Sequence, residues 1–319
     1  MYLNNDIDWL NYLRKAKVYI FGGGFRGRNV LCKLKKYEIE VLGFIDNNTQ
    51  LQGQLIYDKE VISLDDYCRL DEENIIVICS AYELEIKKQL LDKHIFNFIS
   101  QNQIDFGGGV EHYDKAYFEW QKEMGKFGGR IKTHLFQPYI SEEDVLVEFG
   151  AGGGYLINNL MAKEKIAIEI NTEARKNIEA FGVKAVATAD QLDDNYADVI
   201  ISNSVLEHVE NPLGELRKLY NILKPGGRMV FYVPNESCET EYYRSDINNH
   251  LYTWNCLNIG NLFKAAGFFI HKVERVQEMW PSDFINLEKN LPKEVLDEII
   301  MIKGKAFDAN RCLIIAYKT

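Results

Sequence analysis

The chain has 319 residues, of which 46% are hydrophobic and 12% aromatic, and its formal net charge at pH 7 is −10. This length suffices for two domains with buried cores, and the acidic balance argues against a nonspecific grip on nucleic acid, which needs a basic surface. No apolar run reaches the roughly 18 residues of a membrane span, and the first residues resemble neither a secretion signal nor a transit peptide. We therefore expect a cytoplasmic protein of two domains that binds small molecules, with neither nucleic acid nor membrane as a partner.

The six cysteines are scattered along the chain without a C-x-x-C pair. Zinc sites and redox centres need closely spaced thiols, so this pattern predicts no structural metal. A disulfide framework is equally unexpected in a long chain without a secretion signal. Small buried thiols are the interpretation that remains.

Strand-like and helix-like segments alternate along the first hundred residues. Four apolar runs are expected to be strands, at residues 17–21, 40–46, 74–80 and 96–100. Helical patterns over residues 28–37 and 82–93 separate them. This alternation predicts a small parallel sheet of about four strands, in a Rossmann-like domain that spans residues 1–105.

A glycine turn follows the first of these strands. Gly22, Gly24 and Gly27 fit the pattern G-x-G-x-x-G, and Asp46 ends the next strand at the spacing of a ribose-binding acid. A nicotinamide site would need a second nucleotide-binding half and a catalytic group, and neither is apparent. A nucleotide or nucleotide-sugar site and a structural module without a ligand both remain open.

The linker between the domains is expected at residues 106–112, where three glycines follow one another. An aromatic-rich helical segment, residues 113–136, comes next and should break at Gly128–Gly129. A second alternation then begins. Its expected strands are residues 144–150, 165–170, 184–188, 197–204, 228–234, 268–276 and 311–319.

A second glycine turn follows the first strand of this half, with a different pattern. Here Glu148 precedes Gly150, Gly152 and Gly154 at alternate positions, and Glu169 stands 21 residues after Glu148. Together with the later "ADVIISNSVLEHVENP" and "LKPGG" segments, this order resembles class I S-adenosylmethionine (SAM) dependent methyltransferases. The resemblance covers about residues 113–319. It implies an α/β fold with a seven-stranded sheet and an antiparallel last strand, and SAM as the cofactor.

The resemblance assigns cofactor roles to particular residues. Gly150, Gly152 and Gly154 would pass beside the amino-acid part of SAM, and Glu148 would orient this loop or the ammonium group. Glu169 would accept both ribose hydroxyls, as a carboxylate can. The remaining assignments are Asp190 to the adenine amino group, and Asn203 with Ser204 to the methionine moiety. Two simpler roles stay open, namely that Glu148 caps the following helix and that Asp190 starts a turn.

The aromatic segment before the second sheet is expected to cover the cofactor as a lid. Tyr117 and Trp120 are three residues apart, so a helix presents them on one face. An aromatic wall beside a sulfonium gains cation–π attraction, although core packing would explain the same spacing. Gly125, Gly128 and Gly129 could let the lid move.

Two histidines lie on the expected acceptor side. His208 follows the fourth strand, and His250 lies in "NNHLYTW", which resembles a segment of sugar-tailoring methyltransferases. The resemblance implies a general base at His250 or His208 and substrate contacts at Asn249 and Tyr252. The family often carries an acid before this histidine, and the asparagine found here weakens an acid–histidine pair. A capping or packing role for His208 remains an alternative.

The first domain resembles the N-terminal Rossmann-like domains of bacterial sugar-modifying acetyltransferases. This resemblance implies that it binds the nucleotide part of a nucleotide-sugar, and that the methyl acceptor is a sugar or a nucleotide-linked sugar. Other interpretations are O- or N-methylation in secondary metabolism and a noncatalytic SAM or nucleotide sensor. The methylated atom and the oligomeric state stay open.

Overall fold

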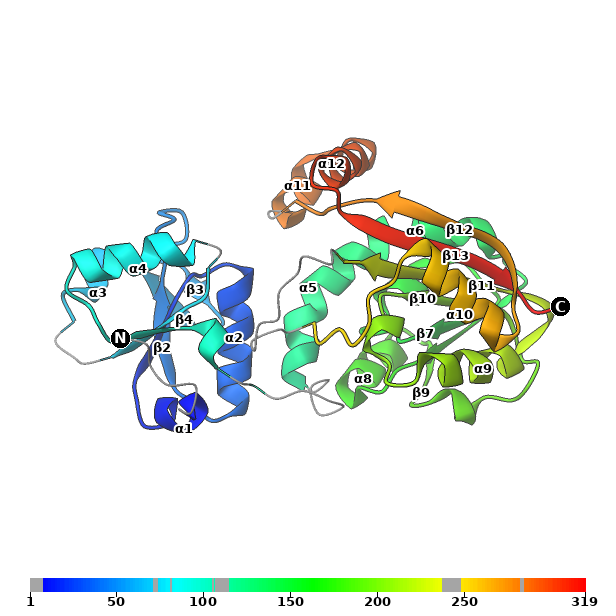
Figure 1. Ribbon diagram of the computed structural model, residues 1–319, viewed down its shortest axis with the longest axis horizontal. Coiled ribbons are helices and arrows are strands. Elements are labelled where there is room, and N and C mark those ends of the chain that lie inside the picture. Colours follow the sequence, from blue (N-terminus) through cyan, green and yellow to red (C-terminus); the bar gives the residue numbers. More distant parts are fainter. Residues whose placement is uncertain are drawn as a thin grey trace. The chain divides into compact units, whose positions relative to one another are not determined.

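A computed structural model describes residues 8–70, 74–80, 82–104, 106, 115–236, 248–281 and 284–319. These residues fall into two compact units (Figure 1). The first contains the described residues up to Phe106 together with Asn248. The second contains residues 115–236 and 249–319. Each unit is built around its own sheet, and each is described by itself.

The first unit has a six-stranded sheet with the strand order β3-β4-β2-β1-β5-β6. All neighbours are parallel except the β3–β4 hairpin. The strands are β1 (Val18–Phe21), β2 (Val41–Ile45), β3 (Leu55–Ile56), β4 (Lys59–Ile62), β5 (Ile75–Ile78) and β6 (Phe98–Ser100). Strand β1 pairs with β2 on one side and with β5 on the other, and β4 pairs with the far edge of β2. The order in which successive strands are added therefore reverses between β1 and β5, and ligands of such sheets bind at this point.

The hairpin β3–β4 corrects the expected count of about four strands. Its two turn residues, Tyr57 and Asp58, both have positive φ, 48° and 66°. This is the backbone of a tight type I′ hairpin turn, which sequences normally signal with Asn or Gly. Because neither residue is present, the sequence pattern gave no sign of the hairpin.

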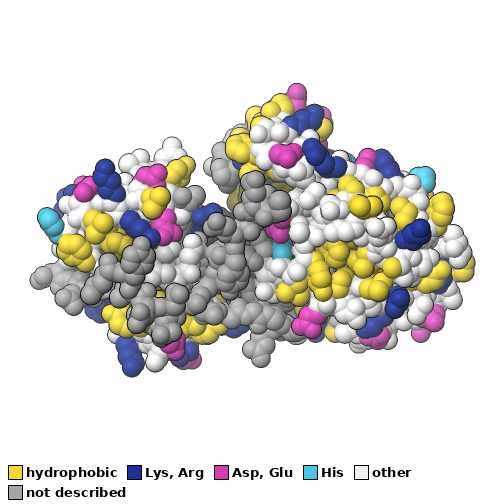
Figure 2. Space-filling model, viewed as in Figure 1, with side chains coloured by type: hydrophobic (Ala, Val, Ile, Leu, Met, Phe, Trp, Pro, Cys, Tyr) yellow, Lys and Arg dark blue, Asp and Glu magenta, His cyan; other side chains and the backbone are white. Residues whose placement is uncertain are grey.

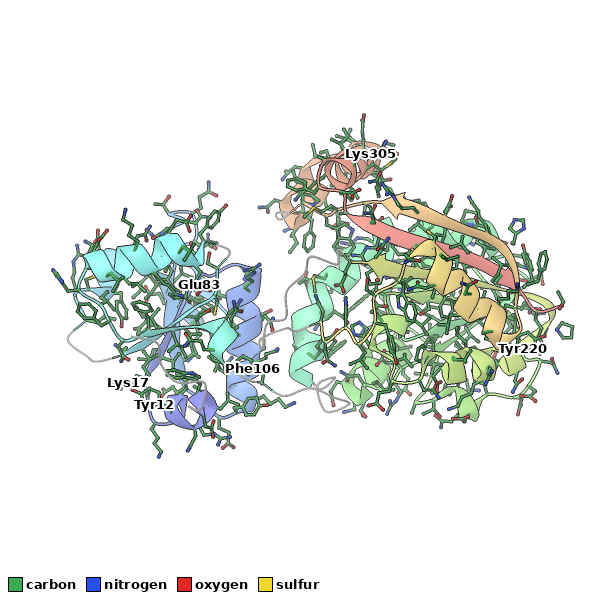
Figure 3. All side chains as sticks on the ribbon, in the orientation of Figure 1. Tyr12, Lys17, Glu83, Phe106, Tyr220 and Lys305 are labelled. Carbon is green, nitrogen blue, oxygen red and sulfur yellow. The ribbon has the colours of Figure 1, made fainter. Side chains whose placement is uncertain are left out.

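Helices cover both faces of the first sheet. They are α1 (Trp9–Leu13), α2 (Phe25–Lys36), α3 (Leu64–Tyr67), α4 (Glu83–Asp92) and the short helix η1 (Gln101–Gln103). Helices α1 and α2 pack into one apolar cluster, and α3 and α4 pack into the other. Phe106, expected in the linker, is buried in the first cluster, where Lys33 Nζ lies 4.9 Å from its ring centroid (Figure 3). The expected linker residues 107–112 lie outside the described part of the chain.

The second unit has a seven-stranded sheet with the order β12-β13-β11-β10-β7-β8-β9. Only β13 runs antiparallel to its neighbours β11 and β12, and the other pairs are parallel. The strands are β7 (Val145–Phe149), β8 (Glu164–Ile168), β9 (Lys184–Val186), β10 (Ala197–Asn203), β11 (Leu223–Asn235), β12 (Phe269–Gln277) and β13 (Asn310–Tyr317). The expected seven-stranded α/β sheet with an antiparallel closing strand is confirmed, and its switch point lies between β7 and β10.

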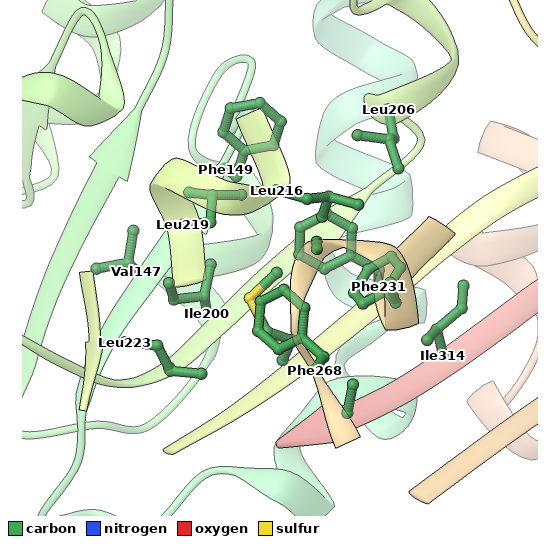
Figure 4. Close-up of a cluster of buried hydrophobic side chains, with 14 of the residues drawn as sticks. Val147, Phe149, Ile200, Leu206, Leu216, Leu219, Leu223, Phe231, Phe268 and Ile314 are labelled. Carbon is green, nitrogen blue, oxygen red and sulfur yellow. The ribbon is translucent and has the colours of Figure 1, made fainter. Parts of the chain in front are cut away.

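Alternate residues of these strands face two separate cores, as the period of a strand requires. Val147 joins the core under α9 and α10, whereas Leu146 joins the core under α6, α7 and α8. Figure 4 shows the first of these clusters, where Leu216 and Leu219 of α9 lie over strand residues such as Ile200. At its rim lies Tyr220 (Figure 3), whose ring meets that of Phe268 edge-on, with centroids 5.0 Å apart.

The helices of the second unit are α5 (Lys115–Ile131), α6 (Thr133–Phe136), η3 (Gln137–Tyr139), α7 (Tyr155–Asn159), α8 (Thr172–Ala180), η4 (Ala189–Gln191), η5 (Leu206–His208), α9 (Pro212–Ile222), α10 (Cys256–Ala266), α11 (Phe284–Asn290) and α12 (Lys293–Ala306).

Helix α5 runs unbroken through Gly128 and Gly129, contrary to the expected break. These glycines allow close packing instead. A Cβ at Gly129 would lie 2.5 Å from the backbone carbon of Tyr155, and one at Gly128 would lie 2.8 Å from the ring of Trp280. The helix is thus held between α7 on one side and the aromatic cluster of α11 and α12 on the other.

A buried ion pair joins the end of α5 to the end of β12. Lys132 donates to Glu278, and both side chains are more than nine-tenths buried. Burial lowers the pKa of Lys132 to about 8, against the opposing effect of Glu278.

On the visible surface of each unit, basic and acidic side chains are intermixed (Figure 2). Within the described residues, no helix combines the length and apolarity needed to traverse a bilayer.

Candidate functional site

The glycine loop after β7 begins at the switch point of the second sheet. Gly150, Gly152 and Gly154 have φ of +71°, +52° and +75°, a region that L side chains rarely adopt. Space is also restricted, because a Cβ at Gly150 would lie 2.4 Å from the methyl groups of Val205. The loop therefore needs its glycines for conformation and for close approach to the segment after β10.

Glu148 is buried beneath this loop. Its Oε2 accepts the backbone N–H of Ile157 in α7 at 3.1 Å, so the carboxylate caps the helix that follows the loop. Burial raises the pKa of Glu148 to about 8, opposed by this hydrogen bond. The structure thus shows the simpler capping role, and orientation of the loop or of the ammonium group by Glu148 stays a prediction.

Glu169 follows β8 and holds the loop from the other side. Its Oε2 accepts the N–H of Gly152 at 2.6 Å, and its Oε1 accepts the N–H of Asn171 at 2.8 Å. Burial raises the pKa of this carboxyl group above its ordinary value, although these backbone donors oppose the shift. Each oxygen retains a lone pair for a further donor. Ribose binding at Glu169 therefore stays a prediction that this geometry permits.

Asn203 and Ser204 end β10 next to the loop. The amide oxygen of Asn203 is buried and accepts no hydrogen bond from the described residues. Ser204 has a positive φ of 56°, and its Oγ accepts a long hydrogen bond of 3.4 Å from Arg311 of β13. A buried acceptor without a donor is uncommon in folded proteins, so Asn203 offers an open position for a ligand amine or hydroxyl.

Asp190 is engaged elsewhere. Its Oδ2 accepts from Lys218 Nζ of α9 at 2.9 Å, and 62% of its side chain is exposed. It also lies in the short helix η4, which agrees with the turn role suggested as its alternative. The adenine contact stays a prediction, since a carboxylate can accept a second donor while it pairs with Lys218.

Helix α5 reaches the glycine loop through a residue that sequence reasoning missed. A Cβ at Gly152 would lie 3.2 Å from Oε1 of Gln121. Tyr117 precedes Gln121 by one helical turn and so shares its face, whereas the side chain of Trp120 lies outside the described residues. The amide side chain gave no signal in an aromatic-rich segment.

Three titratable side chains converge beyond β10. The ligand atoms of Glu207, His208 and His250 all lie within 4.8 Å of one another. Oε1 of Glu207 is 3.9 Å from Nε2 of His208 and 4.0 Å from Nε2 of His250. The two imidazole rings meet edge-on, with centroids 4.7 Å apart. We call this group the His–Glu cluster.

The backbone explains why residues 42 positions apart meet here. The carbonyl oxygen of Glu207 accepts the N–H groups of Leu251 at 2.8 Å and Tyr252 at 3.1 Å. The hydroxyl of Tyr252 donates to the carbonyl oxygen of Glu210 at 2.9 Å. These bonds fix the segment that carries His250 against the segment that carries His208. Tyr252, expected as a substrate contact, has this structural role here. Asn249 adopts a positive φ of 53° beside it.

Glu236, at the end of β11, supplies the acid that the sequence lacked before the histidine. Nδ1 of His250 lies 2.8 Å from Oε1 of Glu236. A carboxylate can only accept, so Nδ1 carries the proton and Nε2 is left as the basic nitrogen. An acid–histidine pair is therefore present, with its acid 14 residues upstream. Sequence spacing could not show this pair because a long connection separates its members.

Among the described residues, no hydrogen bond explains the burial of Glu207. Its side chain is 0% exposed, and neither oxygen accepts a hydrogen bond from any other described residue. Burial raises its pKa to about 7, against the opposing influence of His250 and Arg311. Sequence reasoning used "VLEHVENP" only for His208, and the acid beside it was overlooked.

The first glycine turn has a similar backbone arrangement. Gly22 has a φ of +118°, and a Cβ at Gly27 would lie 1.8 Å from the carbonyl oxygen of Gly22. Oδ2 of Asp46 accepts the N–H of Gly23 at 2.6 Å. Gly24, by contrast, has open space around it. These four predicted residues therefore meet at the switch point of the first sheet.

Comparison with protein families assigns separate descriptions to the two halves. Residues 120–273 match the family described as a methyltransferase domain. Residues 14–102 match a family described as C2185-like, N-terminal. The second description names no ligand, so it does not test the nucleotide-sugar expectation.

Curated relatives resemble the second half. The ubiquinone biosynthesis O-methyltransferase of Caulobacter vibrioides is 30% identical over 162 residues, which are 40% of this chain and 63% of the relative. The malonyl-[acyl-carrier protein] O-methyltransferase of Priestia megaterium is 28% identical over 158 residues, 46% of this chain and 52% of the relative. The chain thus spans between half and two thirds of their length. A crystal structure of a SAM-dependent methyltransferase from Archaeoglobus fulgidus is 18% identical with a TM-score of 0.45, covering 63% of this chain and 99% of that one.

Proposed function

We propose that this chain, whose second unit is a class I SAM-dependent methyltransferase domain, transfers the methyl group of SAM to a hydroxyl oxygen of a small molecule. The observation that carries the proposal is the His–Glu cluster at the edge of the sheet where such domains bind their cofactor. An amine or a thiol could attack a sulfonium with little help. A hydroxyl needs a base, and a histidine held by a carboxylate is suited to that task.

In this proposal, the glycine loop and Glu169 bind SAM. The carboxylate already accepts the N–H of Gly152, so it couples the ribose to the loop beside the methionine part. Asn203 and Ser204 contribute polar atoms on the neighbouring strand end. Glu148 sets the loop's position through α7. Gln121 and Tyr117 close the site from α5 and exclude water.

His250 is the proposed base. Glu236 holds the Nδ1–H of its ring, so Nε2 can accept the acceptor's proton. The hydroxyl oxygen then attacks the methyl carbon in line with the carbon–sulfur bond. That bond breaks with its electron pair on sulfur, which yields S-adenosylhomocysteine, a methyl ether and protonated His250. His208 lies beside the base and contacts the acceptor.

We further propose that the acceptor is a sugar or a nucleotide-linked sugar. Support comes from the N-terminal unit, where a glycine turn and Asp46 converge at a switch point suited to a nucleotide. Gly22, Gly24 and Gly27 would lie along its phosphates, and Asp46 would take its ribose. Asn249 and Tyr252 lie next to His250 and would contact the sugar. A cytoplasmic location remains part of this proposal.

Turnover measured by mass spectrometry tests the proposal. The full chain is incubated with SAM and a panel of hydroxyl acceptors that includes UDP- and dTDP-sugars, and S-adenosylhomocysteine is quantified. Formation of methylated sugar with His250-dependent turnover is the expected result. SAM binding without turnover on any acceptor would favour the alternative, a noncatalytic SAM sensor.

A further inference from the structure

Glu207 presents an unusual combination of burial and isolation within the His–Glu cluster. Its carboxylate is 0% exposed and accepts no hydrogen bond from any other described residue. An ionised carboxylate in such a position costs several kcal/mol unless a partner compensates it. The nearest basic nitrogens, at 3.9 and 4.0 Å, are too far for a hydrogen bond. The space between these three atoms therefore suits a species that all three can bind.

We propose that Glu207, His208 and His250 bind a divalent transition-metal ion of the zinc, cobalt and iron class. Two imidazoles and one carboxylate form a common ligand set for such ions, and this set leaves coordination positions open for another molecule. Metal bonds of about 2.0–2.2 Å place neighbouring ligand atoms about 3–3.5 Å apart. The observed separations, 3.9 and 4.0 Å from Glu207 and at most 4.8 Å within the whole set, are wider than this range, so the three side chains would close on the ion.

Glu236 supports the assignment independently of these distances. Histidines that bind metals usually donate their other ring N–H to a carboxylate or a carbonyl oxygen, which fixes the ring and leaves one nitrogen for the ion. His250 shows this arrangement, with Nδ1 2.8 Å from Glu236 Oε1 and Nε2 on the side of Glu207. Magnesium and calcium prefer all-oxygen ligands, so two imidazole nitrogens favour the transition ions.

The local charge also favours a cation. Two carboxylates, Glu207 and Glu236, act at the cluster, and Arg311 is the cation that influences Glu207 from β13. The two acids outnumber this arginine, so a bound dication would be compensated to within one charge.

The consequence for methyl transfer rests on the proposed function, whereas binding of the ion does not. With an ion present, both imidazoles are ligands, and the acceptor hydroxyl would occupy an open coordination position. Such an ion would lower the pKa of that hydroxyl and would replace His250 as the group that activates the acceptor, whose proton would then pass to water. Methyl transfer would otherwise follow the proposed function, with the carbon–sulfur bond breaking toward sulfur.

Cobalt provides the direct test, because its visible absorption reports imidazole and carboxylate ligation. Chelator-treated full-length protein is titrated with Co²⁺ and followed by absorbance, and a parallel Zn²⁺ titration is followed by calorimetry. One equivalent per chain is expected. Glu207→Gln and His250→Gln should each weaken binding by about 100-fold or more, and Glu236→Gln by about 10- to 100-fold. The matched control is His271→Gln, at an exposed histidine of β12, which should bind cobalt as the parent does.

The folded state and SAM binding are measured on the same samples by circular dichroism and calorimetry. The inference is overturned if folded wild-type protein takes up no stoichiometric cobalt. Binding that Glu207→Gln and His250→Gln both leave intact overturns it as well. SAM binding without cobalt binding removes the metal inference alone. Cobalt binding without SAM binding contradicts the proposed function and leaves the metal site standing.

Discussion

In both units of this chain, an acid after the second strand of the sheet holds a glycine loop by its backbone. Asp46 accepts the N–H of Gly23 at 2.6 Å, and Glu169 accepts the N–H of Gly152 at the same distance. Around these loops the units differ. The residue two positions before the first glycine is buried in both units. It is Ile20 in the first unit and Glu148 in the second.

The carboxylates that follow the strand on the other side of the first strand, β5 in one sheet and β10 in the other, also differ. Glu83, after β5, pairs with Lys87 and accepts the hydroxyl of Ser100 at 2.8 Å. Glu207, after β10, is fully buried and accepts no hydrogen bond from the other described residues. A satisfied acid stabilises its surroundings, whereas an unsatisfied buried acid indicates a site that awaits a ligand or a proton. The two loops therefore share a backbone arrangement, and the difference in their surrounding carboxylates supports our proposal that the second loop serves the chemistry.

The largest expected effect is on turnover. Replacing His250 with glutamine removes the proposed base, and loss of a general base lowers the rate by about 100- to 10,000-fold. SAM affinity should change little, because His250 belongs to the acceptor side. Initial rates and calorimetry on the same preparation check both parts. His271→Gln serves as the control, and turnover that survives in His250→Gln would remove this histidine from the mechanism.

The next largest effect is on SAM affinity, which should distinguish Glu169 from Asp46. Glu169→Ala deprives the ribose of its acceptor and leaves the N–H of Gly152 without its partner, so SAM should bind about 10- to 100-fold more weakly. Asp46→Ala makes the matching change in the first unit and should leave SAM affinity unaltered. Calorimetric dissociation constants for both variants test this contrast. Equal losses in the two variants would mean that the loops do not have separate ligands.

A further pair of variants compares how strongly each loop requires glycine for the stability of the folded chain. Alanine at Gly150 would have an unfavourable φ of +71° and a Cβ 2.4 Å from Val205, which should cost about 1–3 kcal/mol in the free energy of unfolding. Alanine at Gly24 meets nothing within 4 Å and loses only the preference for glycine at the N-cap of α2, so it should cost less than about 1 kcal/mol. Urea unfolding followed by circular dichroism measures both. Similar losses at the two positions would contradict this account of the second loop.

The last prediction concerns pH. The pKa of Glu148 is raised from 4.5 to about 8, so the folded state holds this proton more tightly than the unfolded state. Its contribution to stability is therefore full below pH 4.5 and is lost as pH rises through 8. The slope is at most about 1.4 kcal/mol per pH unit. Glu148→Gln should show a smaller decline than the parent in urea unfolding at pH 6, 7 and 8, and parallel curves would contradict the shift. Ile20→Val supplies a control without a titratable group at the matching position.

The sequence predicted the second sheet well because its strands are long apolar runs and its glycine pattern has a recognised order. It missed the hairpin at Tyr57–Asp58, whose positive φ angles occur without Gly or Asn. It also assigned a helix break to Gly128–Gly129, where the glycines instead admit Trp280 and Tyr155. That packing depends on partners distant in the chain, which local patterns do not encode.

The sequence predicted which residues belong to the candidate site better than it predicted which of them contact one another. Glu148, Glu169 and the glycines lie together because each lies at or just after the carboxyl end of a neighbouring strand of one sheet. The partners of His250 could not be found in the same way. Glu236 reaches its ring from the end of β11, and Glu207 lies near it because backbone hydrogen bonds join Glu207 to the residues after His250. A buried acid without a partner becomes visible only once burial is known.

Calorimetric titration of SAM into the full-length chain tests the central claim most directly. We predict saturable binding at one site, retained in Asp46→Ala and weakened in Glu169→Ala. Absence of heat from a folded wild-type sample, with either SAM or S-adenosylhomocysteine, would contradict the account. Binding that Asp46→Ala abolishes and Glu169→Ala preserves would contradict it equally, because the cofactor would then belong to the first loop.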